Sequence, residues 1–143
     1  MAEDGLVIVY TGGGKGKTTA ALGMALRAVG YGHKVCMIQF IKGSWHYGEM
    51  DSSKRLVPEF ELVAAGKGFV GILDEINYAV NLGLIKSSNV VELIKTKPKK
   101  LDLVLTGNHA KEEIIELAGL VTEMKEIKHP FKSGKKAKKG IDF

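Results

Sequence analysis

The stretch "TGGGKGKTTA", Thr11 to Ala20, decides how this 143-residue chain is interpreted. It follows the apolar run "LVIVY" at residues 6–10 and precedes a segment whose apolar residues recur at three- and four-residue steps as far as Val29. The first pattern is typical of a strand buried on both faces, and the second of a helix. Glycines between them let several backbone amides point inward, beside the partial positive charge of the helix end. The stretch therefore predicts a phosphate-binding loop.

The side chains of this loop suit the task of holding a chain of phosphates. Lys17 supplies a full positive charge, and the Thr18 hydroxyl suits a magnesium ion that bridges phosphate oxygens. The usual pattern has a glycine five residues before the Gly-Lys pair, where this chain has Thr11, so the loop is a variant. The residues expected to contact the nucleotide are Gly12, Gly13, Gly14, Lys15, Gly16, Lys17, Thr18 and Thr19.

Two carboxylates, Asp74 and Glu75, directly follow a second apolar run, "FVGIL". A phosphate loop needs an acidic group at the end of another buried strand to hold its metal ion. Carboxylates there would complete the shell of a magnesium ion, directly or through water, together with Thr18. The alternative is an acidic pair that only stabilises the N-terminus of a helix.

Strand and helix patterns alternate along the rest of the chain. The predicted strands include "KVCMIQF", "FELVAA", "LDLVLTG" and "LVTEMKEI", and the predicted helices include "SSNVVELIKTK", with Ser88 as its cap, and "AKEEIIELAG". The stretch "IKGSWHYGEMDSS" shows no periodicity and is predicted to be a loop. This order favours a mostly parallel sheet covered by helices, with ligands at the carboxyl ends of the strands. The length fits a single domain over residues 1–143.

Composition and charge narrow the function classes. No apolar run approaches the roughly 20 residues of a bilayer crossing, and the acidic start "MAEDG" is unlike a secretory signal, so we expect a cytoplasmic protein without a membrane partner. The net charge of +5 is concentrated in "KTKPKK" and in a basic tail over residues 130–143. These lysines leave open an alternative function, a regulatory or nucleic-acid-binding ATPase.

Five motifs in order resemble the P-loop family of corrinoid adenosyltransferases. They are the variant loop "TGGGKGKTT", "QFIKGSWHYGE", "GKGF", "LDEINYA" and the closing "LVTEMKEIKHPFKSGKKAKKGIDF". The resemblance runs nearly from end to end and implies a three-layer α/β/α P-loop NTPase fold of RecA-like type. It also implies a homodimer that binds ATP and Mg²⁺, and no nucleic acid.

What the resemblance implies chemically is transfer of the 5′-deoxyadenosyl group of ATP to the Co(I) of a reduced corrinoid, such as cobalamin or cobinamide, with release of triphosphate. The cobalt is the nucleophile, so no side chain is needed as a general base. Lys17, assisted by Lys15, would stabilise the leaving triphosphate as catalytic residues. Thr18, Asp74 and Glu75 would hold the metal ion, and an electron donor such as a flavoprotein would reduce the cobalt.

The corrinoid side of the resemblance rests on two aromatic residues and shows two departures. Phe69 matches a family position beneath the corrin. Trp45, in the loop after the second predicted strand, would either flank the nucleotide or the corrinoid or anchor its loop on the core. Two residues after Phe69 the family often has tryptophan, where this chain has Gly71, and Asn108 stands where arginine is frequent. These departures keep open a second alternative, a corrinoid and ATP binder with impaired catalysis.

A family segment is also missing near residues 70–74. The family carries a helix and the start of the acidic strand between Phe69 and Asp74, whereas only "VGIL" stands here. A crossover between parallel strands needs about a dozen residues or more. We therefore expect either a reduced architecture or a break in the chain between these two residues, and we favour the break.

Overall fold

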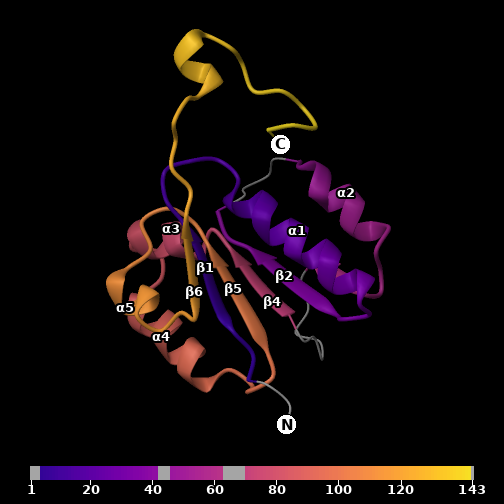
Figure 1. Ribbon diagram of the computed structural model, residues 1–143, viewed down its shortest axis with the longest axis vertical. Coiled ribbons are helices and arrows are strands. Elements are labelled where there is room, and N and C mark those ends of the chain that lie inside the picture. Colours follow the sequence, from indigo (N-terminus) through magenta and orange to yellow (C-terminus); the bar gives the residue numbers. More distant parts are fainter. Residues whose placement is uncertain (1–3, 42–45, 63–69, 143) are drawn as a thin grey trace.

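The computed structural model is an all-parallel sheet with helices on both faces, and it describes residues 4–41, 46–62 and 70–142 (Figure 1). The strands of the sheet are β1 Val7–Thr11, β2 Val35–Gln39, β3 Phe60–Leu62, β4 Val70–Asp74, β5 Asp102–Thr106 and β6 Leu120–Glu123. Their order across the sheet is β3-β2-β4-β5-β1-β6. The carboxyl ends of β4, β5 and β1 therefore lie side by side, and the candidate site forms at these strand ends.

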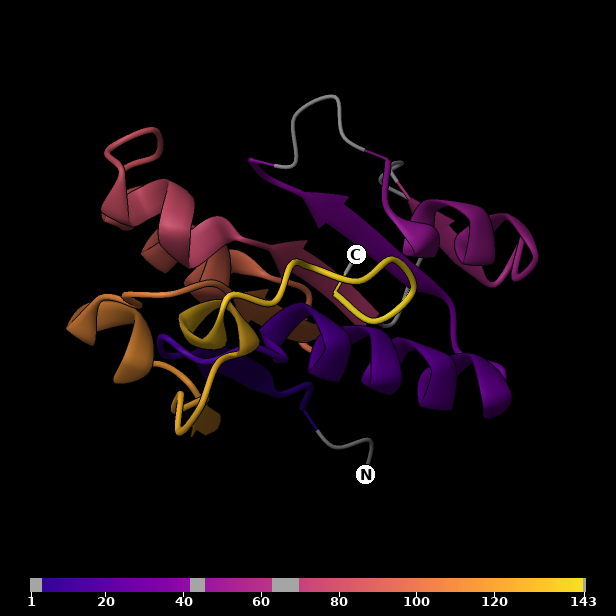
Figure 2. The ribbon, with the colours of Figure 1, turned by 90° about the horizontal axis from the view of Figure 1, so that it is seen from above.

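The helices divide between the two faces of the sheet. They are α1 Lys17–Gly30, α2 Gly48–Lys54, α3 Ile76–Asn81, α4 Ser87–Thr96 and α5 Glu112–Ile115, followed by the 3₁₀ helix η1 Pro130–Ser133. α1 covers one face and α3, α4 and α5 cover the other, as the view from above shows (Figure 2). The predicted three-layer α/β/α arrangement is confirmed.

The alternation of side chains along β1 and β5 builds two separate cores. Val9 and Leu105 pack with residues of α3, α4 and α5, whereas Ile8 and Val104 pack with α1. Each of these four side chains is nearly or wholly buried. Because successive strand residues point to opposite faces, one apolar run supplies both cores, as expected of a strand buried on both sides.

Two local predictions are wrong. Residues 48–54, expected to be part of a loop, form α2, which has Glu49 and Asp51 in its first turn and Lys54 in its last. Charges so placed favour the helix dipole even without an apolar stripe. Ser88 does not cap α4, because the helix already begins at Ser87 and Lys86 occupies the cap position without a side-chain hydrogen bond.

The expected chain break is also wrong for residues 70–74. β4 is continuous, and its register with β2 is unbroken from Val35 opposite Val70 to Gln39 opposite Asp74. Gly71 therefore lies inside a strand, opposite Cys36. Phe69, its link to Val70, and Trp45 lie outside the described residues.

Among the helices of the described residues, none has the length and apolar character of a membrane span.

Candidate functional site

The loop between β1 and α1 leaves the first amides of the helix available to a ligand. Gly16 occupies the cap position of α1 with a φ of 108°, and no side chain there accepts a hydrogen bond from the helix start. This left-handed backbone is readily adopted by glycine and strained for other residues. The uncapped N–H groups and the helix dipole together favour an anion such as a phosphate.

Lys17 lies folded over the loop that precedes it. Its Nζ donates hydrogen bonds of 2.8 Å to the carbonyl oxygens of both Gly12 and Gly14. Burial lowers the pKa of the Lys17 ammonium from 10.5, and the nearby carboxylates of Glu75 and Asp74 oppose this shift. The ammonium thus lies between two loop carbonyls, where a phosphate oxygen could replace one of them as acceptor.

The segment after β6 forms the back wall of the loop. The amide of Gly14 donates to the carbonyl of Met124 across 2.7 Å, and the amide of Met124 donates to Thr11 across 2.8 Å. A methyl group on Gly14 would lie 2.8 Å from the Met124 oxygen, and one on Gly12 would lie 2.5 Å from it. These contacts explain why two of the three consecutive glycines are needed, whereas Gly13 is exposed and has open space around it.

An acidic cluster lies directly behind the helix start. The hydroxyl of Thr18 donates to Oδ1 of Asp74 across 2.8 Å, and the hydroxyl of Thr106 donates to the same oxygen across 2.7 Å. Asp74 and Thr106 are fully buried. Glu75 follows with a φ of 63° and lines the pocket together with Thr18. The structure thus brings together the three residues predicted to hold a metal ion.

The oxygen atoms of this cluster suit Mg²⁺. The Thr18 hydroxyl and the carboxylates of Asp74 and Glu75 are hard oxygen donors of the kind that this ion binds. No three His, Cys, Asp or Glu side chains gather into a metal-binding group within the described ranges. A magnesium ion here would therefore take its remaining ligands from phosphate and water oxygens, as is usual at nucleotide sites.

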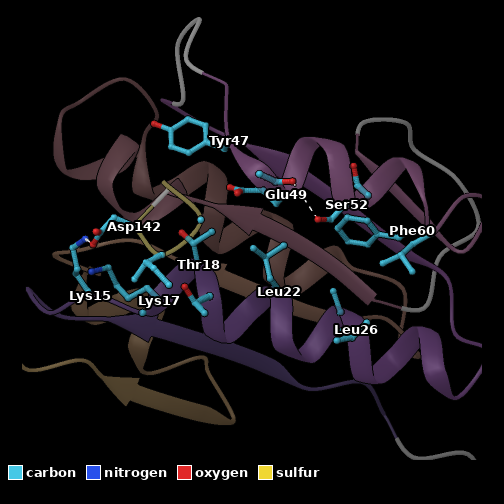
Figure 3. A pocket seen from close by; sticks show the side chains of 18 of the residues that line it. Lys15, Lys17, Thr18, Leu22, Leu26, Tyr47, Glu49, Ser52, Phe60 and Asp142 are labelled. Carbon is cyan, nitrogen blue, oxygen red and sulfur yellow. Dashed lines mark hydrogen bonds and ion pairs between the residues drawn. The ribbon is translucent and has the colours of Figure 1, made fainter. Parts of the chain in front are cut away.

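A pocket of about 690 Å³ opens in front of the loop and extends between α1 and α2 (Figure 3). Its phosphate end carries the lysines and hydroxyls of the loop, and its far end is more apolar. The lining side chains labelled in the figure are Lys15, Lys17, Thr18, Leu22, Leu26, Tyr47, Glu49, Ser52, Phe60 and Asp142. A pocket of this size, apolar with a few convergent polar groups, is typical of small-molecule sites.

The end of the chain closes one side of this pocket. Gly140, Ile141 and Asp142 line it, and the carboxylate of Asp142 forms an ion pair with the ammonium of Lys15. This hydrogen bond to Lys15 is the main cause that lowers the pKa of Asp142, and the backbone amide of Lys138 contributes as a second donor. The end of the basic tail thus lies against the phosphate loop, 127 residues away in sequence.

The sequence predicts the phosphate-loop side of the pocket but not the side formed by α2 and the C-terminal segment. Of the predicted residues, Lys15, Gly16, Lys17, Thr18, Thr19 and Glu75 line the pocket, and Asp74 lies behind it. The residues that it missed are Thr106, Glu49 and Asp142. Thr106 ends the strand next to that of Asp74, which is a usable signal once strand order is known. Asp142 gives no local signal.

Comparisons with known proteins agree with this geometry. A family model described as ATP:corrinoid adenosyltransferase BtuR/CobO/CobP matches residues 3–71 and 70–143. The corrinoid adenosyltransferase of Escherichia coli (strain K12) is 35% identical over 170 residues, covering 99% of this chain and 87% of that protein. That of a Sinorhizobium species is 38% identical over 174 residues, covering 99% and 81% respectively. The corrinoid adenosyltransferase CobA of Salmonella typhimurium (strain LT2) is 34% identical over 170 residues, with coverages of 99% and 87%. Matches of this extent show that the chain belongs to the ATP:corrinoid adenosyltransferase family.

Proposed function

We propose that this protein transfers the 5′-deoxyadenosyl group of ATP to the Co(I) of a reduced corrinoid and releases triphosphate. The observation that carries the proposal is the pocket next to the phosphate loop, together with the membership of the chain in this family. A phosphate loop, a lysine and a carboxylate meet at one end of it, and apolar side chains of α1 line the continuation. One end can hold a polyphosphate while the other receives a bulky apolar group.

In the proposed reaction the protein has to stabilise the leaving triphosphate. The Co(I) lone pair forms a bond to the 5′ carbon of the ribose, the bond between that carbon and its oxygen breaks, and its electrons leave with the triphosphate. No proton has to move, so no general base is needed. The ammonium of Lys17 and the first amides of α1 stabilise the charge that develops on the leaving oxygen. Lys15 adds a second cation at the pocket edge.

The proposal includes Mg²⁺, which Thr18, Asp74 and Glu75 would hold directly or through water. When bound, the ion supplies positive charge to the phosphate oxygens. Asp74 keeps the Thr18 hydroxyl turned toward the acidic cluster through their 2.8 Å hydrogen bond. Carboxylate oxygens, a hydroxyl and phosphates form the kind of shell that this ion prefers.

The family resemblance supports further parts of the proposal. We expect a cytoplasmic homodimer that takes a corrinoid such as cobalamin or cobinamide. An electron donor such as a flavoprotein would supply Co(I). Trp45 and Phe69 remain candidates for contacts with the nucleotide or the corrinoid.

One observation favours a second candidate, a binder of ATP and corrinoid that transfers slowly. Gly71, at the place where the family often has a tryptophan, lies within β4 opposite Cys36. A strand position in the sheet is unsuited to a loop residue that wedges beneath a corrin. On this second candidate the phosphate end is intact and the corrinoid end is incomplete.

A single assay separates these functions. The protein is incubated with ATP, Mg²⁺ and chemically reduced cobalamin, and adenosylcobalamin and triphosphate are measured together. Equal amounts of both products support transfer. Binding of ATP and cobalamin without products supports the second candidate. Orthophosphate release that DNA stimulates would support the nucleic-acid-dependent ATPase and refute the proposal.

A further inference from the structure

We infer that Thr106, at the end of β5, is a positioning residue for the acidic pair of the nucleotide site, an inference that rests on the proposed function. Its hydroxyl donates to Oδ1 of Asp74 across 2.7 Å and accepts the backbone N–H of Glu75 across 2.9 Å. A hydroxyl has one hydrogen to donate. The amide of Glu75 occupies an acceptor position, so the hydrogen of Thr106 is directed at Asp74. One buried side chain thus holds two successive residues of the candidate metal site.

The bond to the Glu75 amide supports an uncommon backbone conformation. Glu75 has a φ of 63°, in the left-handed region that residues with a side chain rarely adopt. The surrounding structure has to hold such a conformation, and outliers of this kind gather at functional sites. Here the turn keeps Asp74 buried in the strand and brings Glu75 to the pocket lining. The Thr106 oxygen accepts from the amide at this turn.

The bond to Asp74 fixes the orientation of a carboxylate shared by two hydroxyls. Oδ1 of Asp74 accepts from Thr106 on one side and from Thr18 on the other, at 2.7 and 2.8 Å. When the Thr18 hydroxyl ligates a cation, its donation to Asp74 stays useful because it turns the oxygen lone pairs toward the ion. Removing the Thr106 donor takes away one of the two hydroxyls that fix the direction of Oδ1, so the carboxylate can turn further about its side-chain bond. The orientation of Thr18 would then change with it.

The end of β5 is anchored independently of the Thr106 hydroxyl. The amide of Gly107 donates to the carbonyl of Tyr10 across 3.1 Å. Gly107 also packs so closely on α3 that a methyl group there would lie 2.8 Å from the backbone nitrogen of Tyr78. Replacing Thr106 by valine, which has nearly the same shape, should therefore leave the strand in place. The effect of the hydroxyl can then be separated from that of the fold.

The experiment measures ATP binding by calorimetry as a function of Mg²⁺ concentration, without corrinoid. We expect Thr106→Val to raise the Mg²⁺ concentration for half-maximal ATP binding by about tenfold or more, the usual effect of losing a group that orients a metal ligand. Binding in EDTA should stay within about twofold of wild type, because the loop itself is unchanged. Thr106→Ser restores the hydroxyl and should recover most of the Mg²⁺ response.

The matched control is Thr96→Val on α4, which removes a hydroxyl that donates only to the carbonyl of Glu92 on the exposed surface. It should leave the Mg²⁺ response unchanged. An unshifted Mg²⁺ midpoint in Thr106→Val would overturn the inference. So would an equal loss of binding with and without Mg²⁺, which marks a structural role, or a Ser variant as defective as Val.

The same data separate this inference from the proposed function. One outcome would support the inference and refute the proposed transfer. In it, wild-type protein binds ATP in the presence of Mg²⁺ and Thr106→Val raises the Mg²⁺ midpoint, but wild-type protein makes no adenosylcobalamin. Wild-type protein that binds no ATP would overturn both. Transfer activity together with a Thr106→Val protein of normal Mg²⁺ response would overturn the inference alone.

Discussion

Adding one methyl group at Gly14 should destabilise the protein, whereas the same change at Gly13 should not. The methyl carbon on Gly14 would lie 2.8 Å from the Met124 carbonyl oxygen and 2.9 Å from the carbonyl carbons of Met124 and Lys125. All three are backbone atoms, which cannot rotate away as the end of a side chain can. The hydrogen bond of 2.7 Å from the Gly14 amide to Met124 would lengthen as the loop moved out.

The contacts set the size of the effect. Overpacking costs about 1–3 kcal/mol and a lost backbone hydrogen bond about 1 kcal/mol, so Gly14→Ala should lower the free energy of unfolding by about 2–4 kcal/mol. A methyl group on Gly13 would meet no atom within 4 Å beyond its neighbours in the chain, and the φ of Gly13 lies outside the left-handed region. Gly13→Ala should therefore change the free energy of unfolding by less than about 1 kcal/mol, in the stabilising direction.

Urea unfolding followed by far-ultraviolet circular dichroism measures both variants against wild type. Calorimetry then shows whether the displaced loop also binds ATP more weakly. For Gly14→Ala we expect the dissociation constant for ATP to rise by at least about tenfold. If the two alanine variants unfold at the same urea concentration, the segment at Met124 is not what fixes the loop, and our account of the back wall is wrong.

Three further predictions concern charges at the pocket. Lys17→Ala should cut adenosyl transfer by about a hundredfold or more, as other losses of an anion-stabilising donor do, and near-normal turnover would refute its role. Because burial lowers the pKa of Lys17 from 10.5, the unfolded chain binds more protons between that lowered pKa and 10.5. Over that window the stability contributed by this group rises with pH, while ATP affinity, which needs the ammonium, falls as pH rises through the lowered pKa. Lys17→Arg should move this loss of affinity to higher pH in a calorimetric titration. Asp142→Asn should tighten ATP binding, by no more than about fivefold, because it frees Lys15 from an exposed ion pair. That gain should shrink as salt is added, and weaker binding would contradict it.

The sequence predicted the parts of the site that are continuous in the chain. Lys17 and Thr18 could be placed because a strand, glycines and a helix follow one another within some twenty residues, and each has a local pattern. Asp74 could be placed because an apolar run ends directly before it. In each case the neighbours in sequence are also the neighbours in space.

The parts that the sequence did not predict depend on contacts between distant segments. Thr106 acts on Asp74 only because β5 pairs with β4, and Asp142 reaches Lys15 across 127 residues. α2 was missed for another reason. Its residues carry no apolar stripe at helical spacing, so the helix depends on its charged ends and on its packing near β3 rather than on periodicity. Patterns of hydrophobicity cannot report such an element.

The connection between β3 and β4 remains the unusual feature of this chain. Both strands are parallel to β2 and lie on opposite sides of it, yet only residues 63–69 separate them in sequence. A parallel crossover commonly needs a dozen residues or more. The family match divides into two stretches that overlap at residues 70–71, and the alignment of 170 residues with the Escherichia coli relative is longer than this chain. We therefore propose that a crossover segment of the family is missing here.

The burial of β2 agrees with this proposal and offers a test of it. On the α1 face Val35 and Met37 are 2% and 0% exposed, whereas Ile38, on the opposite face, is 39% exposed. Inserting the relative's crossover residues before Val70 should cover this face. Full burial of an isoleucine contributes about 1.5–3 kcal/mol, so covering the exposed two-fifths of Ile38 should add about 1 kcal/mol to the free energy of unfolding. A glycine-serine insert of equal length is the control, and it should add nothing. If both inserts give the same urea midpoint, the exposed face of β2 is not the place of a missing helix, and the proposal of a missing crossover segment on this face is wrong.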